Sequence, residues 1–184
     1  TSYLGGLWGA GDPTLDTVIS PITTNDAAVL EFDFIPTSNL LSFKYVFGSE
    51  EYLEWVNFGY NDAFGFFLSG PNPAGGMYVD QNLAIVPGTA NIPVTIDNVN
   101  DLVNSTYYVD NGDGSTAPQN TDPTVIQFDG FTTPLTATAD VNCGDTYHIK
   151  LVVADAGDWS WDSGVFLEAG SFYSPPLSIV DDLS

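Results

Sequence analysis

Basic residues are almost missing from this sequence. Lys44 and Lys150 alone oppose 24 acidic side chains among 184 residues, so the formal net charge at pH 7 is -22. We expect no nucleic-acid partner, because a surface without basic residues cannot neutralise phosphates. Charge of one sign repels itself within a folded domain, and divalent cations bound to clustered carboxylates would relieve that repulsion. Scattered carboxylates would instead suit solubility in a salty medium, so the clustering of the acidic residues decides between the two interpretations.

Cysteine and long apolar runs are scarce as well. The single Cys143 excludes an internal disulfide, and the lack of any CxxC or Cys/His pattern argues against zinc. No apolar run is long enough to span a bilayer, and no basic-then-apolar leader opens the sequence, so we expect no membrane insertion. The chain begins at Thr1 without a methionine. We interpret it as part of a longer exported protein, with an extracellular location at the cell surface.

Apolar and aromatic residues, in contrast, are plentiful. Hydrophobic residues make up 43% and aromatic residues 14% of the chain, which predicts a folded domain despite the charge. Short segments that alternate apolar and polar residues recur between Gly, Pro, Asn and Asp, whereas helical periodicity is almost absent. This pattern predicts an all-β fold, an antiparallel β-sandwich that is jelly-roll-like and has long acidic loops. We expect a single ligand-binding domain over residues 1–173 and a linker toward a following module over residues 174–184.

The alternation also predicts individual elements. The longer strands are expected at residues 28–35, 40–47, 63–69, 133–141, 147–154 and 165–172. Shorter strands are expected at residues 17–20, 83–86, 94–96 and 125–128, a weak helical turn at 98–107, and loops at 70–80 and 110–122. Within residues 28–35, Leu30, Phe32 and Phe34 share one face, which we expect to be core. Segments 28–35 and 40–47 are interpreted as one hairpin, and segments 147–154 and 165–172 as another.

Acidic residues concentrate in two loops that also carry aromatic residues. Residues 154–170 read ADAGDWSWDSGVFLEAG, and residues 48–61 read GSEEYLEWVNFGYN. If the strands that these loops join lie side by side, the loops meet at one end of the sandwich. Calcium takes about six to eight oxygen ligands, and closely spaced carboxylates and amides supply them. The predicted calcium ligands in these loops are Glu50, Glu51, Asn61, Asp62, Asp155, Asp158 and Asp162.

A third acidic loop, residues 110–122, gives a weaker signal. Its DNGDG run resembles the start of an EF-hand loop, but the full spacing fails because Asp110 and Asp113 are three residues apart. Asp110, Asn111, Asp113 and Asp122 are candidate calcium ligands. An ordinary solvated turn is the equal alternative. Several calcium ions are therefore expected in the protein as a whole.

Aromatic residues beside the acidic positions are candidates for ligand contact. Trp159 and Trp161 lie in one loop, and Trp55 and Tyr60 lie in the other. The alternative for any single ring is that it pins the loops as part of a small core.

Catalysis is not expected. Glu50 and Asp155 would serve as a glycosidase pair only at a defined separation, and His148 lies within a predicted strand. No nucleophile elbow, P-loop or HExxH pattern occurs. An isopeptide bond at Lys44 or Lys150 is a further alternative, with an ion pair as the more ordinary role of each.

Several longer segments together resemble one known family. They read FKYVFGSEEYLEW, NDAFGFFLSGP, LAIVPGT, FDGFTTPLTATADV and YHIKLVVADAGDWSWDSGVFLEAGSF, and they span about residues 29–172. This set resembles the choice-of-anchor L domain family of bacterial surface proteins. Leu53 stands where proline often follows the SEEY motif, and the loop near Asn57 lacks the cysteine that many members carry.

The resemblance implies adhesion. A similar module in giant calcium-dependent repeat adhesins acts as a peptide-binding domain that attaches the cell to other surfaces. The expected partners are therefore a peptide or protein on another cell and neighbouring modules of the same long chain. A glycan bound in a lectin-like manner is the alternative. The motif positions that carry over are Glu50, Glu51, Asn61, Asp62, Asp155, Asp158, Asp162 and Glu168.

Overall fold

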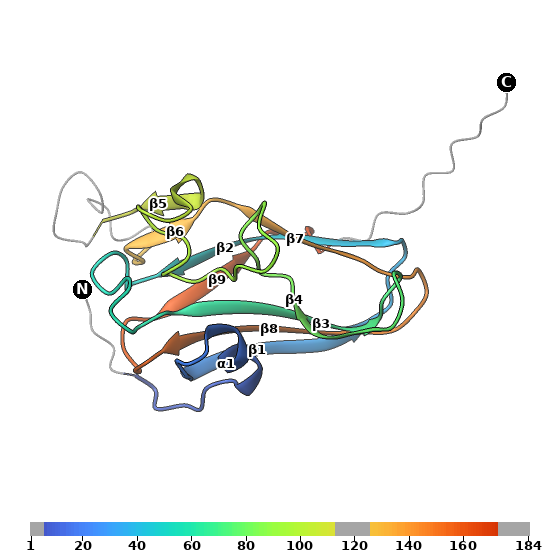
Figure 1. The fold of residues 1–184 in the computed structure, drawn as a ribbon, viewed down its shortest axis with the longest axis horizontal. Helices are drawn as coiled ribbons and strands as arrows, with labels where there is room; N and C mark the ends of the chain where they lie inside the picture. The colour runs from blue at the N-terminus through green and yellow to red at the C-terminus, as the bar shows by residue number, and fades with distance from the viewer. Residues whose placement is uncertain (1–5, 113–125, 173–184) are drawn as a thin grey trace, which may run out of the picture.

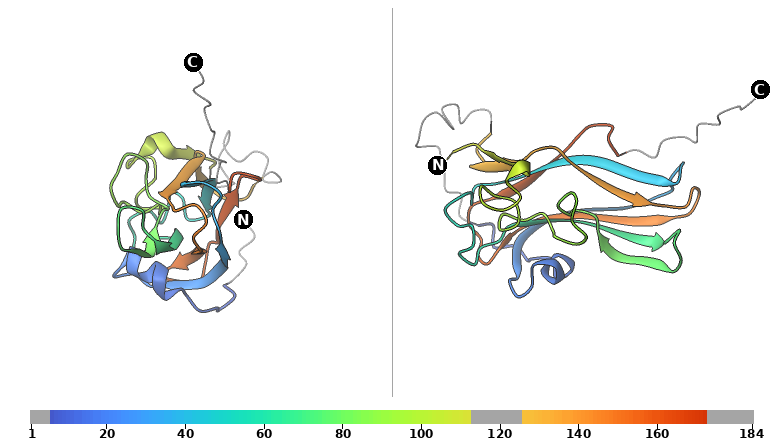
Figure 2. Two further views of the ribbon diagram at one scale, coloured as in Figure 1. Left: turned by 90° about the vertical axis from the view of Figure 1, so that its right-hand side faces the viewer. Right: turned by 45° about the horizontal axis from the view of Figure 1, so that its top comes forward.

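Two antiparallel sheets pack face to face in the computed structural model, which describes residues 6–112 and 126–172 (Figure 1). Sheet A has the order β1-β8-β3-β4, with β1 at Thr24–Phe34, β8 at Tyr147–Ala156, β3 at Ala63–Pro71 and β4 at Met77–Asn82. Sheet B has the order β5-β6-β2-β7, with β5 at Tyr108–Asp110, β6 at Gly130–Thr132, β2 at Leu40–Ser49 and β7 at Leu135–Asp140. Strand β9, Ser163–Leu167, also pairs with β2. The predicted all-β sandwich is confirmed (Figure 2).

The core lies between the sheets and follows the alternation in the sequence. In β2, Leu41, Phe43, Tyr45 and Phe47 are buried at every second position, as expected for one inward face. Strand β3 differs, because almost all of its residues are buried. Its inward side chains join the main core, whereas Phe67 on the opposite face belongs to a smaller apolar cluster.

The short helix α1, Pro13–Ile19, covers this outer face of sheet A. Asp12 caps the helix by accepting the N–H groups of Thr14 and Leu15 at 3.0 Å each, and proline occupies the first helical turn. Leu15 and Ile19 are buried in the cluster that contains Phe67. The predicted edge strand at residues 17–20 is therefore wrong, because the Asp-Pro start and the two apolar contacts favour a helix.

The predicted hairpins are also wrong. The connections β1 to β2, β2 to β3 and β8 to β9 each run from one sheet to the other. Strands β3 and β4 do form a hairpin, so the predicted loop at residues 70–80 contains most of a strand. Asn72 builds its turn by accepting the N–H groups of Ala74 and Gly75. The β2–β3 and β8–β9 crossings lie at the same end of the sandwich, at the left of Figure 1.

The remaining elements differ from expectation in smaller ways. Residues 83–86 and 94–96 form isolated bridges rather than strands. Their apolar side chains other than Ile85 are nevertheless buried in the core. The predicted helical turn shortens to a 3-10 helix, η1, at Ser105–Tyr107. The predicted strand at 125–128 is wrong over its described residues, because residues 126–128 form no strand. Residue 125 and the predicted linker at 174–184 lie outside the described residues. Among the described residues, no helix is long and apolar enough to cross a membrane.

Both lysines and the histidine form ion pairs. Lys150 of β8 lies 2.5 Å from Asp12, and the two side chains are 17% and 8% exposed. Lys44 lies 3.3 Å from Glu168, and both of these side chains are more than half exposed. His148 binds Asp33 at 2.8 Å on the outer side of β1 and β8, and this contact with Asp33 is the first cause that raises the pKa of the histidine.

The two lysine pairs predict different effects on stability. Lys150→Met leaves Asp12 buried without its cation and should lower the free energy of unfolding by about 2–4 kcal/mol. Lys44→Met is the matched control and should cost less than about 1 kcal/mol, because water screens its pair. Urea denaturation of both variants measures the difference, and equal costs would contradict the role given to the Lys150–Asp12 pair.

Candidate functional site

The two acidic loops meet at one end of the sandwich, as expected, although crossovers rather than hairpins bring them there. The N–H of Glu50 donates to the carbonyl oxygen of Asp162 at 3.1 Å. The N–H of Asn61 donates to the carbonyl oxygen of Ala156 at 3.3 Å. These backbone bonds hold the loop after β2 against the loop after β8, so their side chains share one surface.

Asp62 lies at the centre of this junction and is fully buried. One carboxylate oxygen, Oδ1, accepts the N–H of Ala156 at 2.9 Å. The other, Oδ2, accepts the hydroxyl of Ser163 at 2.6 Å and that of Ser49 at 3.4 Å. Ala156 ends β8 in sheet A, whereas Ser49 and Ser163 belong to β2 and β9 in sheet B. A single carboxylate therefore joins the two sheets.

Two further buried carboxylates, Glu51 and Asp155, surround Asp62, and we call these three the carboxylate cluster. Glu51 is 1% exposed, and its Oε2 atom is buried without a hydrogen-bond partner among the described residues. Burial, followed by the charge of Asp62, raises the pKa of Glu51 far above its usual range. The same two causes, with the charge of Asp162, raise the pKa of Asp155 to about 8. Burial also raises the pKa of Asp62.

No basic side chain compensates the cluster, because both lysines of the chain pair elsewhere. At neutral pH these carboxyl groups must therefore keep protons or bind a cation. Oxygen-rich sets of this kind suit a hard cation such as calcium. As placed, no three Asp, Glu, His or Cys side chains within residues 6–112 and 126–172 form a metal-binding group. A calcium ion would require the carboxylates to turn toward a common point.

The other predicted ligands of the two loops lie around the cluster. Glu50 is partly buried, and burial with the charge of Asp162 raises its pKa. Oδ1 of Asn61 accepts the N–H of Asp97 at 3.1 Å, and Oδ1 of Asp158 accepts the N–H of Ser160 at 2.9 Å. Asp162 is exposed.

Of the third loop, the structure describes residues 110–112. Asp110 is on β5, separated from β2 by β6, and its Oδ1 accepts the N–H of Gly112 at 2.9 Å. Asp113 and Asp122 lie outside the described residues.

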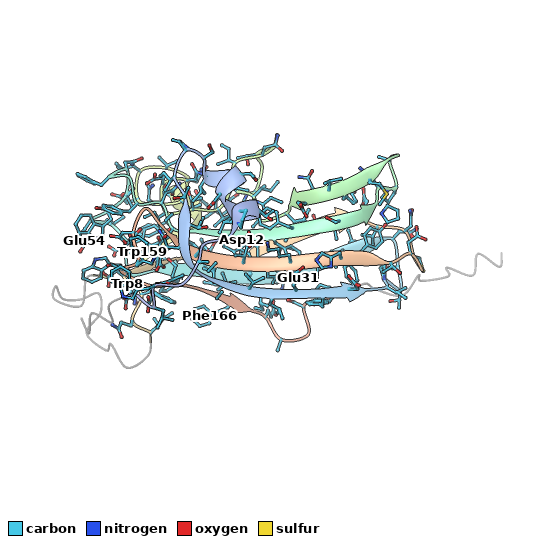
Figure 3. The ribbon with its side chains drawn as sticks, turned by 90° about the horizontal axis from the view of Figure 1, so that it is seen from below. Trp8, Asp12, Glu31, Glu54, Trp159 and Phe166 are labelled. Atoms are coloured by element: carbon cyan, nitrogen blue, oxygen red, sulfur yellow. The ribbon has the colours of Figure 1, made fainter. Side chains whose placement is uncertain are left out.

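Three of the four predicted aromatic residues lie in two ring pairs. Trp55 contacts Tyr60 edge to face with ring centroids 5.3 Å apart. Trp159 packs on Trp8, with ring centroids 5.2 Å apart and a tilt of 35° between the rings. Trp8 is 77% exposed, and the sequence pattern did not identify it (Figure 3).

Trp8 is held in place by contacts that are distant in sequence. The carboxylate of Asp26 accepts the N–H of Leu7 at 2.8 Å and the N–H of Gly9. Gly6 lies so close to the Trp159 carbonyl that a Cβ would collide with it. Asn25 donates from Nδ2 to the carbonyl oxygen of Asp158 at 2.8 Å. Glycine on both sides of Trp8 was the only signal of this close approach.

The raised pKa of Asp155 predicts how the metal-free protein responds to pH. The folded state holds a proton on Asp155 that the unfolded state releases near pH 4, so this group should lower the stability progressively as pH rises from about 4 to about 8. Thermal melting in a chelator measures this decline. Asp155→Asn should make the slope shallower from about pH 4 upward. His148→Asn is the comparison, because the raised pKa of His148 removes stability only as pH rises above about 6.5, so this variant should keep the wild-type slope below about pH 6. An unchanged slope in Asp155→Asn would contradict the assignment.

Comparison with known proteins assigns the chain to a family. The choice-of-anchor L domain matches residues 3–173. No curated protein sequence and no solved structure matches the chain. The match includes both acidic loops and the segment that carries Trp8. Choice-of-anchor domains are associated with surface-bound or secreted proteins. The chain belongs to the choice-of-anchor L domain family.

Proposed function

We propose that the chain is a calcium-dependent adhesion module of a large bacterial surface adhesin. It binds peptide or protein ligands of other cells at the end of the sandwich where the acidic loops meet. The observation that carries this proposal is the carboxylate cluster, whose Glu51 Oε2 is buried without a partner among the described residues. Family membership supports the surface location.

The cluster fits calcium by the chemistry of its donors. Glu51, Asp62 and Asp155 would supply carboxylate oxygens, and Glu50 and Asp158 lie on the same two loops. Hard oxygen ligands of this kind select calcium over softer metals. A bound calcium ion would supply positive charge and an open coordination position for an oxygen of the ligand. Such a position would explain how so acidic a protein accepts an anionic group.

The aromatic pairs provide the apolar part of the proposed binding surface. Trp8 and Trp159 lie on the side of the loop after β8, and Trp55 and Tyr60 lie on the loop after β2. Exposed tryptophan is enriched where proteins bind partners. We assign the surface to binding rather than to catalysis. A glycan is the second candidate ligand, because an exposed ring such as Trp8 also suits stacking on a sugar.

Calcium should stabilise the protein strongly. Free calcium at about one hundred times Kd adds about 2.7 kcal/mol to the free energy of unfolding. Each such site should then raise the melting temperature by roughly 5–10 °C in a chain of this length. Scanning calorimetry with calcium and with a chelator measures the shift. An identical melting temperature in both buffers would contradict the proposal.

Glu51→Gln provides a sharp control for this experiment. Glutamine keeps the volume and the uncharged form that burial favours for Glu51, so in chelator the variant should melt at or above the wild-type temperature. In calcium it should lose most of the gain. Equal calcium shifts in both proteins would exclude Glu51 as a ligand.

The ligand surface is tested separately from the metal. Free-carboxylate peptide libraries and glycan arrays, each with and without chelator, identify the ligand class. Trp8→Ala and Trp159→Ala should then weaken binding at least about tenfold, as expected for a buried aromatic contact, with calcium affinity unchanged in calorimetry. Val79→Ala, an exposed residue of β4, is the matched control. Full binding by both tryptophan variants would exclude this surface.

A further inference from the structure

An apolar groove opens at the side of the sandwich between β1 and β9. A cavity of about 250 Å³ lies there, and its walls are Ala28, Val29 and Leu30 of β1 and Val165 and Leu167 of β9. A second cavity of about 110 Å³ shares Leu30 and Leu167 and extends the opening toward Phe32 and Phe172. We call the two together the side groove. In Figure 3, Glu31 marks β1 and Phe166 marks β9 on either side of it.

Leu30 shows that this part of the core is incomplete. It pairs with Leu151 in the register of β1 and β8, and it shares the inward face with Phe32 and Phe34, which pack against the main core. Leu30 is nevertheless 52% exposed, so the prediction that this face is core fails at this position. An inward leucine without a covering side chain leaves apolar surface in water.

The chain itself covers both ends of the free edge of β1. At the acidic end, Ala10 forms an antiparallel bridge with Asn25, and the N–H of Ala27 donates to the carbonyl oxygen of Ala10 at 3.0 Å. At the other end, the Phe172 ring packs edge to face on Phe32 and Phe34, with centroids 5.6 and 5.3 Å apart. The edge over residues 28–31 stays uncovered among the described residues, a length of roughly 13 Å.

This uncovered edge has little of the usual protection against pairing. Residues 28–30 are apolar, and Glu31, the one charged residue of residues 28–31, is engaged with His148 at 3.0 Å. Natural edge strands carry charges, prolines or bulges that block another strand. The bulge of β1 lies between Asn25 and Ala28, before the uncovered edge, and residues 27–30 read AAVL. The bridge between Ala10 and Asn25 shows that another segment of the chain already pairs with β1 just before this uncovered edge.

Charge restricts what can occupy the groove. A second copy of this chain would also carry a net charge of -22, so the two copies would repel each other. A segment of another protein that carries basic residues would instead be attracted. We infer that the side groove binds an extended segment of another protein, which adds as a strand to β1 over residues 28–31. Alternate apolar side chains of that segment fill the space between β1 and β9, and basic residues flank them. This contact does not depend on calcium.

A displayed library of random decapeptides, panned against the whole chain, tests the inference. The selected peptides should carry apolar residues at alternate positions with lysine or arginine beside them. Their binding should weaken about tenfold or more in Leu30→Lys and in Leu167→Lys, because each change places a charge in the apolar groove. Val79→Lys adds the same charge to an exposed position of β4 and should bind like the wild type.

Hydrogen exchange separates strand addition from a merely apolar contact. Amides of residues 28–31 that point away from β8 should exchange more slowly when a selected peptide binds. Binding should also persist in chelator below the melting temperature and in Trp159→Ala, which separates this surface from the acidic end. Failure to select any peptide, full binding by both lysine variants of the groove, or unchanged exchange at residues 28–31 would each overturn the inference.

Discussion

The burial of Asp62 between the two sheets is the constraint on which the acidic end depends. Its carboxylate accepts hydrogen bonds from β8 on one side and from Ser49 and Ser163 on the other. Each bond favours the charged form, whereas burial and the charge of Asp158 oppose it. Glu51, Asp62 and Asp155 cannot all be charged and uncompensated in this buried place. Folding of this end is therefore linked to protons or to a cation, and the loops carry that linkage outward to the aromatic pairs.

The distribution of the lysines reinforces this constraint. Lys150 lies on the outer face of sheet A, where it pairs with Asp12, the N-cap residue of α1. Lys44 of β2 in sheet B pairs with Glu168. The chain thus has no cation of its own for the cluster. A lysine at the cluster would fix the loops permanently, whereas a dissociable cation makes their order depend on the medium. This dependence suits a module that acts outside the cell.

The sequence allowed the main strands and the meeting of the two loops to be predicted, because alternation in β2, β3 and β8 and the local excess of carboxylates are local patterns. Pairing of strands is not local. The apolar runs on either side of residues 157–162 predicted a hairpin. Ser163 of β9 instead pairs with Ser49 of β2, in the other sheet from β8. Helix α1 is short and depends on its contacts with β3. Trp8 was missed because its place depends on Asp26 and Trp159, which are distant in sequence.

Strand β1 connects the acidic end with the side groove. Its register shift between Asn25 and Ala28 lets Asp26 turn out of the ladder with φ of 48° and hold the segment that carries Trp8. Asn25 meanwhile binds the carbonyl of Asp158 on the acidic loop. The same irregularity defines where covered edge ends and open edge begins, at Ala28. A β1 without this bulge would continue regular pairing to Thr24, and the N-terminal segment would lose the side chain that anchors it. One local departure from regular strand geometry therefore positions the Trp8–Trp159 pair at the acidic end and leaves the apolar edge beside it exposed.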